Sequence, residues 1–414
     1  MGGRMAGGMK IEITNCTGTR NRGCEALVQC LVDGLRARLG PPEPDIGLHT
    51  NDPLYDAHSI RGLDRIYFSY PTNTPNHFSS FSLNRAIYQL ARCGEHVLPA
   101  RLRGISTRTL SASFAADCIL PTGGDLFTSD YGHLRKQFAY CHDRAKVVLL
   151  GHTIGPFSTA DEKYFIRGAR RFAGISVRER ESYDYIRSLK LDIPIRLSAD
   201  LAFLLEPADG DRCRTLFDNI LHAVDRPVVG ISVSQGIIRY ASLRQKDYYG
   251  IFAAFVDELH RRGKQVLLIP HVQERNPNND DWFACHEVWR RVADKRTCTI
   301  ASGQFRAAEY KGLIGLCECL VGTRTHPTIA SIAQRVPTVG VAYSRKAGSI
   351  FKDVFGDGVA RQLIVDATEL SADALLEAYA FALSHRAEPG RVSAMKRRAE
   401  DNFSFFEEVM THGA

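Results

Sequence analysis

The sequence predicts an α/β protein built from two doubly wound, Rossmann-like domains that face each other across a cleft. Apolar, strand-like runs alternate with helix-like segments along almost the whole chain, as they do in parallel sheets covered by helices. This alternation breaks at the segment 204–213, which is rich in Pro, Gly and acidic residues, and then resumes. A length of 414 residues also exceeds the size at which single hydrophobic cores usually stop growing, so two domains are expected.

The first domain is expected to begin with a strand at KIEITNC, residues 10–16. The segment 23–40 then predicts a helix, because its apolar residues recur at helical spacing before Gly40 and Pro41. Ser158 or Thr159, followed by Glu162, forms the capping-box pattern that starts another helix. The further strands of this domain are expected at residues 65–70, 117–125, 146–155 and from 175 onward.

The second domain repeats the pattern. Its strands are expected at residues 227–235 and 264–273 and within CLVGTRTH and PTVGVAYS. Its helices are expected at residues 244–262, 280–294, 305–317 and 327–335, and two more follow Ser371. We therefore assign residues 9–208 to a first domain, 209–385 to a second, and 386–414 to a C-terminal helix that packs back on the first.

Composition narrows the class of protein. A net charge of +7 and a pI near 8.8 mildly favour anionic ligands, but the chain has no concentrated basic tract, so nucleic-acid binding is not expected. The eleven cysteines are scattered without a C-x-x-C pair, which argues against a disulfide framework or a zinc site. No stretch approaches 18 uninterrupted apolar residues. We expect a cytosolic protein with reduced thiols.

The segment VGTRTHPTIASIAQRVPTVGV, residues 321–341, places an arginine and a histidine at the end of a strand. Its pattern of strand, loop, helix and strand predicts a βαβ crossover. With Pro327 as the first helical residue, His326 would cap the helix, and Arg324 and Thr325 would lie in the loop. Helix N-termini at this edge of a parallel sheet attract anions, so the segment predicts an anion site. In the alternative, Arg324 pairs with a carboxylate and His326 only caps the helix.

Polar and glycine residues also follow two expected strands of the first domain. Asn21, Arg22, Gly23 and Glu25 follow the first strand and open its helix, where loop amides can hold a phosphate or sugar hydroxyls. Gly123 and Gly124 allow close backbone approach, and Asp125 would accept a proton from a sugar hydroxyl or cap the next helix. The alternative for each is turn chemistry alone.

Two more strand ends of the first domain carry candidate ligands. His152 lies in GHTIGP, and Arg178 follows the expected strand at 175. Arg178 is placed for bidentate contact with a carboxylate or phosphate, although a structural pair with Glu181 or Asp200 is the alternative. Asp200 would orient that arginine or cap a helix.

Basic residues of the second domain complete the pattern. His271 and Lys346 each follow an expected strand, as Arg324 and His326 do. Because parallel strands end at one edge of a sheet, these side chains are expected to gather there, together with Arg178 from the facing wall. Such a cluster would suit a compact anion that carries both a phosphate and a carboxylate.

In these motifs the sequence resembles the polysaccharide pyruvyl transferase family. The resemblance covers residues 10–365 and rests on ordered motifs: NRGCEA, PTGGDLF, GHTIGPF, SVRERES, SADLAF, LLIPHVQ and GTRTHPTIASIAQRVPTVGVAYSRK. It implies a fold similar to the two-domain, GT-B-like glycosyltransferases. Two positions depart from the family pattern, namely Cys24, where an acid is usual, and His152, where glutamine is common.

The resemblance implies transfer of the enolpyruvyl unit of phosphoenolpyruvate onto two hydroxyls of a sugar, as a ketal. His326 would protonate the methylene carbon, because histidine titrates in the useful range. In the alternative, the helix N-terminus and neighbouring cations lower the pKa of His326, and it is a neutral hydrogen-bond partner. Arg324, Lys346 and Arg178 would bind the phosphate or carboxylate of the donor, and Asp125 would deprotonate the sugar. The second domain would then be the phosphoenolpyruvate side and the first domain the acceptor side. No metal-ligand spacing is evident, so neither a metal nor another cofactor is expected.

Two other functions stay open at this point. A nucleotide-sugar-dependent glycosyltransferase would use the strand-end cations to hold a diphosphate, and a non-catalytic protein would bind an anionic glycan without turnover. The acceptor, which is a sugar of a polysaccharide or glycan precursor, can be nucleotide-linked or lipid-linked. Peripheral association with the inner face of the membrane and homo-oligomerisation are equally open.

Overall fold

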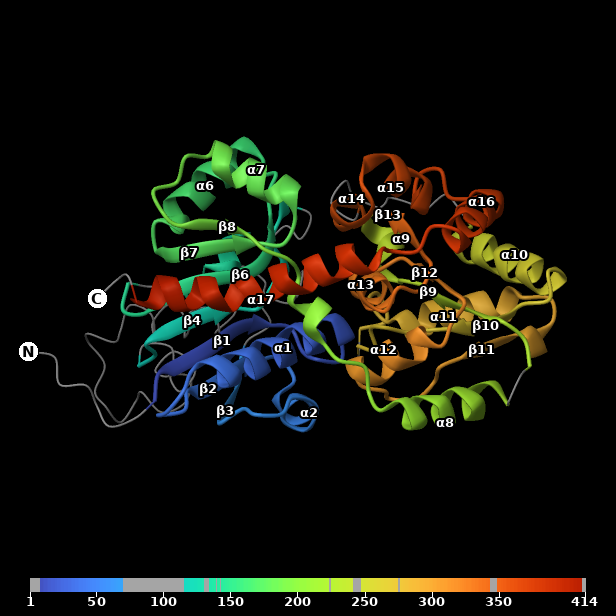
Figure 1. The fold of residues 1–414 in the computed structure, drawn as a ribbon, viewed down its shortest axis with the longest axis horizontal. Helices are drawn as coiled ribbons and strands as arrows, with labels where there is room; N and C mark the ends of the chain where they lie inside the picture. The colour runs from blue at the N-terminus through green and yellow to red at the C-terminus, as the bar shows by residue number, and fades with distance from the viewer. Residues whose placement is uncertain are drawn as a thin grey trace, which may run out of the picture.

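Two parallel β-sheets, each covered by helices, make up the protein (Figure 1). The structure is a computed structural model, and it describes residues 8–69, 115–129, 134–138, 140–141, 143–222, 225–240, 247–274, 276–342 and 348–411. The predicted α/β fold class, with two doubly wound sheets, is confirmed.

The first sheet has the order β3-β2-β1-β4-β6-β7-β8, with β5 paired to β6, and every strand pair is parallel. Its strands are β1 (Lys10–Cys16), β2 (Asp45–Thr50), β3 (Arg65–Phe68), β4 (Cys118–Pro121), β5 (Gly124–Phe127), β6 (Lys146–Ile154), β7 (Phe172–Val177) and β8 (Ile195–Leu197). The chain order reverses between β1 and β4, and ligands of open α/β sheets bind at such a switch point.

Helices connect these strands. They are α1 (Arg22–Arg38), α2 (Pro53–Ser59), α5 (Leu134–Gln137), α6 (Thr159–Ala169), α7 (Arg180–Ser188) and the 3₁₀ turn η2 (Leu201–Leu204). Ser158 is the N-cap of α6, and its side chain accepts a hydrogen bond from the amide of Asp161, as the capping-box pattern predicted. The hydroxyl of Ser158 donates a hydrogen bond to the carboxylate of Asp161 rather than to that of Glu162. The Glu162 carboxylate accepts a hydrogen bond from the Tyr185 hydroxyl instead.

The second sheet has the order β11-β10-β9-β12-β13-β14 and is also parallel throughout. Its strands are β9 (Val228–Ser232), β10 (Gln265–Leu268), β11 (Cys298–Ile300), β12 (Cys319–Gly322), β13 (Thr338–Ala342) and β14 (Ile364–Asp366). The switch point lies between β9 and β12, so the loop that carries Arg324 opens directly from it.

The helices of the second half flank this sheet. They are α8 (Gly210–Leu221), α9 (Gly236–Tyr240), α10 (Tyr248–Arg261), α11 (Asp281–Arg291), η4 (Lys295–Thr297), α12 (Ala307–Gly315), α13 (Thr325–Ala333), α14 (Ser349–Phe355), α15 (Asp357–Leu363) and α16 (Ala372–Leu383). The βαβ unit predicted around the R-x-H segment is β12-α13-β13, and β12 pairs with β13 in parallel.

The last helix, α17 (Pro389–Thr411), contributes to the cores of both halves. Its first turns, including Met395, pack in the core of the second sheet, whereas Phe403 and Phe405 pack in the core beneath β1 and β4. Figure 1 shows α17 running from the boundary between the sheets across the first sheet. Among the described helices, none combines the length and apolar character that a bilayer-spanning segment needs.

Two element boundaries differ from the prediction at places that matter for the site. The strand expected at residues 117–125 is two strands, β4 and β5, because Gly124 adopts a positive φ of 90° that bends the chain. Helix α13 begins two residues earlier than expected, so Arg324 is its N-cap and His326 lies within the first turn. Pro327 fits there because first-turn amides have no intrahelical partner.

Candidate active site

The two sheets are joined by backbone hydrogen bonds at the start of α1. The amide of Arg22 donates to the carbonyl of His271 at 3.1 Å, and the amide of Gln273 donates to the carbonyl of Arg20 at 3.1 Å. Asn21 caps α1 by accepting from the amide of Gly23 at 3.0 Å. The loop after β1 is thus fixed against the segment after β10, and the carboxyl ends of both sheets face one another here.

The imidazole of His326 lies between the two sheets. A Cβ placed on Gly23 of α1 would come within 2.2 Å of His326 Nδ1, so the ring packs directly on that glycine. On the other side, His326 Nε2 lies 3.9 Å from Asp200 Oδ2, which is too long for a hydrogen bond. Nε2 is buried and has no hydrogen-bond partner among the described residues. The ring is therefore positioned with one nitrogen available for a ligand.

Burial lowers the pKa of His326, and the nearby guanidinium groups of Arg178 and Arg324 lower it further, while Asp200 and Asp125 oppose the shift. The free protein therefore holds this imidazole neutral near pH 7. An anion bound beside Nε2 would favour the protonated form and raise the pKa again.

Arg178 is the centre of a buried ion network on the wall of the first sheet. Its Nη1 donates to Asp200 at 2.5 Å, its Nη2 to Asp125 at 2.6 Å and its Nε to the Thr153 hydroxyl at 2.7 Å. Glu179 Oε2 lies 3.4 Å from Nε, and burial raises the pKa of the Glu179 carboxyl to about 7. Only 3% of the Arg178 side chain is exposed, so it serves mainly to hold these acids in place.

The sequence left open whether Arg178 pairs with Glu181 or Asp200, and the structure selects Asp200. Glu181 instead accepts from Lys352 and Ser349 at 2.6 Å. Asp200 has both roles considered for it, because Oδ1 caps η2 through the amide of Ala202 and Oδ2 accepts from Arg178. Asp125 lies in β5 rather than at a helix start and is 26% exposed.

Arg324 is held from its own half of the molecule. Its Nε and Nη2 donate to the two oxygens of the buried Asp281 at 2.8 and 2.7 Å, and Nη2 also donates to Asn279 at 3.0 Å. Asp281 further accepts from the amides of Gln235 and Val272. The pairing of Arg324 with a carboxylate, which was the alternative, is therefore present. It also fixes the orientation of the guanidinium.

Further basic groups meet around His326. His271 is 4% exposed, and its pKa is held well below the usual value by burial first, and then by repulsion between its protonated form and His326, Arg324 and Arg22 when those groups are charged. Arg22 lies inside the NRGCEA motif as the first residue of α1, and the sequence suggested only its loop amide, not its side chain, as a ligand group. The signal for the side chain was a charged residue at the start of the helix that follows a buried strand. Four basic side chains from three segments of the chain therefore lie near one another where the two sheets meet, a boundary that we call the seam. They are Arg22, His271, Arg324 and His326.

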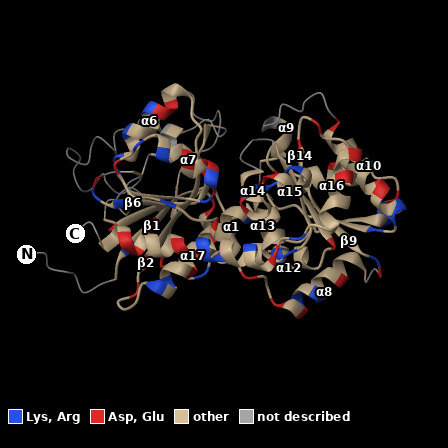
Figure 2. Ribbon diagram, turned by 45° about the horizontal axis from the view of Figure 1, so that its top comes forward, with Lys and Arg blue, Asp and Glu red and all other residues tan. Residues whose placement is uncertain are grey.

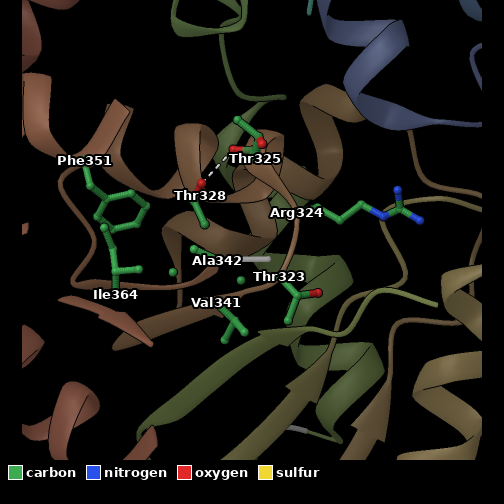
Figure 3. Close-up of a pocket in the computed structure, with 10 residues that line it drawn as sticks. Thr323, Arg324, Thr325, Thr328, Val341, Ala342, Phe351 and Ile364 are labelled. Atoms are coloured by element: carbon green, nitrogen blue, oxygen red, sulfur yellow. Dashed lines mark hydrogen bonds between the residues drawn. The ribbon is translucent and has the colours of Figure 1, made fainter. Parts of the chain in front are cut away.

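A pocket lies beside this cluster, at the ends of β12 and β13 (Figure 3). Thr325, at the first helical position of α13, lines it, and Figure 3 shows the Arg324 side chain extending away from the apolar residues that close it. The lining residues are Gly322, Thr323, Arg324, Thr325, Thr328, Gly340, Val341, Ala342, Phe351 and Ile364. The predicted ligand Lys346 follows Ala342 closely in the chain but lies outside the described residues.

Three predicted residues lie behind the site rather than in it. His152 is fully buried, its Nε2 lies 3.2 Å from the carbonyl of Pro121, and burial lowers its pKa to about 3. A Cβ on Gly123 would come within 3.1 Å of the Leu150 carbonyl, which makes that glycine a packing requirement. Gly124 provides the bend that presents Asp125. Among the described residues, no group of three or more potential metal ligands is arranged to hold an ion.

The fold and the placement of the site define the class of this protein. Two parallel sheets with a site between their carboxyl ends are the architecture of the GT-B-like enzymes. Similar solved structures include the UDP-GlcNAc 2-epimerase from Methanocaldococcus jannaschii, with a TM-score of 0.60, 10% identity, and 97% of this chain and 100% of that chain covered. The UDP-GlcNAc 2-epimerase from Neisseria meningitidis bound to UDP-GlcNAc has a TM-score of 0.56 and 9% identity, with 97% of this chain and 100% of that chain covered. The calicheamicin glycosyltransferase CalG4 has a TM-score of 0.50 and 13% identity, with 98% of this chain and 99% of that chain covered.

Because the sequence identities to these solved structures are so low, the comparisons show only that the fold is shared. A family model narrows the class further, because the model for "Polysaccharide pyruvyl transferase" matches residues 21–345. The chain belongs to the polysaccharide pyruvyl transferase family. The matched range contains Asn21, Arg178, Arg324 and His326, so the family's region spans both walls of the site.

Proposed function

We propose that this protein transfers the enolpyruvyl unit of phosphoenolpyruvate to two hydroxyls of a glycan and leaves it as a pyruvate ketal. The observation that carries the proposal is the buried, unpartnered Nε2 of His326, which lies among acids from one sheet and basic groups from both. An imidazole in that position can gain a proton when an anionic donor binds and can then deliver it. Membership of the family supports the same chemistry.

The reaction can be written with the described residues in named roles. His326 protonates the methylene carbon of the donor, which becomes a methyl group while the adjacent carbon gains oxocarbenium character. A sugar hydroxyl adds to that carbon and gives its proton to Asp125, whose carboxylate is the more exposed one of the Arg178 network. Phosphate then leaves, and the second hydroxyl closes the ring. One hydroxyl proton balances the new C–H bond, and the other leaves with phosphate.

Charge stabilisation belongs to the basic groups. Arg324 offers a guanidinium fixed by Asp281, and Lys346, which lies outside the described residues, is proposed as a second cation. Arg178 supports the donor through its position next to Asp200 and Asp125. The acceptor would approach from the first sheet, past Asn21 and Asp125.

A donor comparison tests this proposal. The protein is incubated with phosphoenolpyruvate or with nucleotide sugars, together with a panel of free, nucleotide-linked and lipid-linked sugars, and release of phosphate and nucleotide is measured. Acceptor-dependent phosphate release from phosphoenolpyruvate is expected. Nucleotide release without consumption of phosphoenolpyruvate would instead identify a glycosyltransferase of the same fold.

A further inference from the structure

Arg22 is a buried guanidinium with part of its hydrogen-bonding capacity unused. It is 1% exposed, and its Nη1 donates to Glu25 at 3.0 Å, to the Thr19 carbonyl at 3.1 Å and to the Tyr55 hydroxyl at 2.6 Å. Its Nε is also buried, yet it has no hydrogen-bond partner among the described residues. Because buried polar groups are nearly always paired, this nitrogen points to an acceptor that a ligand would supply.

Backbone and side-chain contacts place Arg22 next to the residues around His326. Its backbone amide is bonded to the carbonyl of His271, and its charge acts on the imidazole of His271 together with those of His326 and Arg324. The next residue, Gly23, touches the ring of His326. Arg22 therefore belongs to the first-sheet wall, across the seam from Arg324.

The charges around Arg22 favour the binding of an additional anion. Glu25 is the carboxylate paired with Arg22, and burial raises its pKa, which weakens its hold on a full negative charge. Arg324 is paired with Asp281, and the lowered pKa values of His271 and His326 favour their neutral forms near pH 7. The Nε and Nη2 hydrogens of a guanidinium lie on one edge, and that edge takes up a carboxylate or phosphate with two parallel bonds.

We propose that Arg22 is a further donor-binding residue, whose Nε edge holds an oxyanion of the donor from the first-sheet wall. The proposal rests on the proposed function for the identity of the donor. The oxyanion is the phosphate or the carboxylate of phosphoenolpyruvate, since both offer the same paired oxygen atoms. Figure 2 shows acidic and basic residues interspersed over both halves, so a local site rather than a broad basic face must select the anion.

Calorimetric titration of phosphoenolpyruvate, inorganic phosphate and pyruvate into the wild type, Arg22→Gln and Arg20→Gln tests the proposal. Arg20 is a matched control, because it also lies over the Tyr55 ring but pairs with Asp52 at 2.8 Å and is 23% exposed. Arg22→Gln should weaken phosphoenolpyruvate binding by about 10- to 100-fold, the usual worth of a charged hydrogen bond. Arg20→Gln should stay within about twofold of the wild type.

Inorganic phosphate and pyruvate show which group of phosphoenolpyruvate Arg22 binds, the phosphate or the carboxylate. A selective loss of phosphate binding in Arg22→Gln assigns the phosphate, and a selective loss of pyruvate binding assigns the carboxylate. Unchanged binding of all three ligands overturns the role of Arg22 while leaving the donor proposal intact. A wild type that ignores phosphoenolpyruvate but binds phosphate through Arg22 overturns the donor and keeps the anion site.

Glu25→Gln keeps the test decisive if Arg22→Gln does not fold. This substitution keeps the shape of the side chain and removes the charge that competes for Arg22. Phosphoenolpyruvate should then bind more tightly than to the wild type, by about three- to tenfold. Equal or weaker binding to the folded Glu25→Gln protein would overturn the proposal.

Discussion

His326 is held by contacts on both sides of its ring, with Gly23 on one side and Asp200 on the other. A histidine that only caps a helix would not need a second sheet against it. The R-x-H spacing predicted that Arg324 and His326 share the end of a strand, and the structure adds that acids from the first sheet reach the same point. Those acids follow other strands more than a hundred residues away, so their proximity came only from folding.

Replacing His326 by alanine should lower kcat by about 10²- to 10⁴-fold, the usual contribution of general acid catalysis. The substitution removes a ring whose buried Nε2 has no hydrogen-bond partner among the described residues, so thermal unfolding should change little. Steady-state kinetics with phosphoenolpyruvate measures the effect, and His58→Ala, at an exposed position on α2, is the control. A near-normal rate in His326→Ala would place the acid elsewhere.

His152 should make the protein sensitive to acid. Its pKa of about 3 in the folded state lies below the value near 6.5 of the unfolded chain, so the unfolded state binds more protons between these values. The free energy of unfolding therefore falls as pH drops through that window. His152→Gln, which restores the residue common in the family, should remove about 2 kcal/mol of the loss between pH 7 and pH 5. Urea unfolding at the two pH values measures it, and identical pH dependence in both proteins would contradict this assignment.

Residue chemistry near the site was only partly predictable from sequence. That Arg178 is a structural arginine could be stated as an alternative, but its bond to Asp125 joins β5 to β7 and has no local signature. The pairing of Arg324 with Asp281 likewise spans separate helices. The side chain of Arg22 was not proposed as a ligand, because an arginine in a strand-to-helix turn is usually exposed, whereas here it is buried.

At the scale of elements, the start of α1 sets how closely the two sheets approach. Gly23→Ala should disturb the site without unfolding the protein, because the added Cβ would lie 2.2 Å from His326 Nδ1 and the ring would have to move. Displacing a catalytic ring by such an amount commonly reduces the rate by about 10²-fold. Steady-state kinetics of Gly23→Ala measures the effect, and Gly210→Ala is the control. Gly210 is the first residue of α8, and nothing lies within 4 Å of the position of an added Cβ. Equal activity of the two variants would argue against contact between α1 and His326.

Predictability followed the apolar pattern more than the length, since the four-residue strands β3 and β12 were expected, whereas the twelve-residue helix α8 was not. Helices α1, α10 and α17 and strands β1 and β6 carry a clear apolar period and lie close to where the sequence predicted them. Strands β8, β11 and β14 have three residues each, too few for any periodicity to show. Strand β2, DIGLHT, was missed because a glycine and a histidine interrupt its apolar run. In the folded protein, Nε2 of that histidine, His49, lies 2.8 Å from a carboxylate oxygen of the buried Glu12.

At the scale of the whole molecule, α17 ties the two halves together. Phe405 is 1% exposed and packs over Gly174 of β7, while Met395 of the same helix lies in the core of the second sheet. Phe405→Ala should lower the free energy of unfolding by about 3 to 5 kcal/mol. Phe283→Ala, at a side chain that is 42% exposed, should change it by less than about 1 kcal/mol in the same urea titration. A similar small change in both would show that α17 is only loosely attached.

Transfer of the pyruvyl unit to a sugar requires that the methylene carbon of the donor gain an exchangeable proton, the step proposed for His326. Product formed from phosphoenolpyruvate and the acceptor in D₂O, examined by mass spectrometry and NMR, tests this most directly. A pyruvate ketal whose methyl group carries one deuterium for each pyruvyl unit transferred is expected. A product without the pyruvyl group, or one that retains an intact methylene carbon, would contradict it.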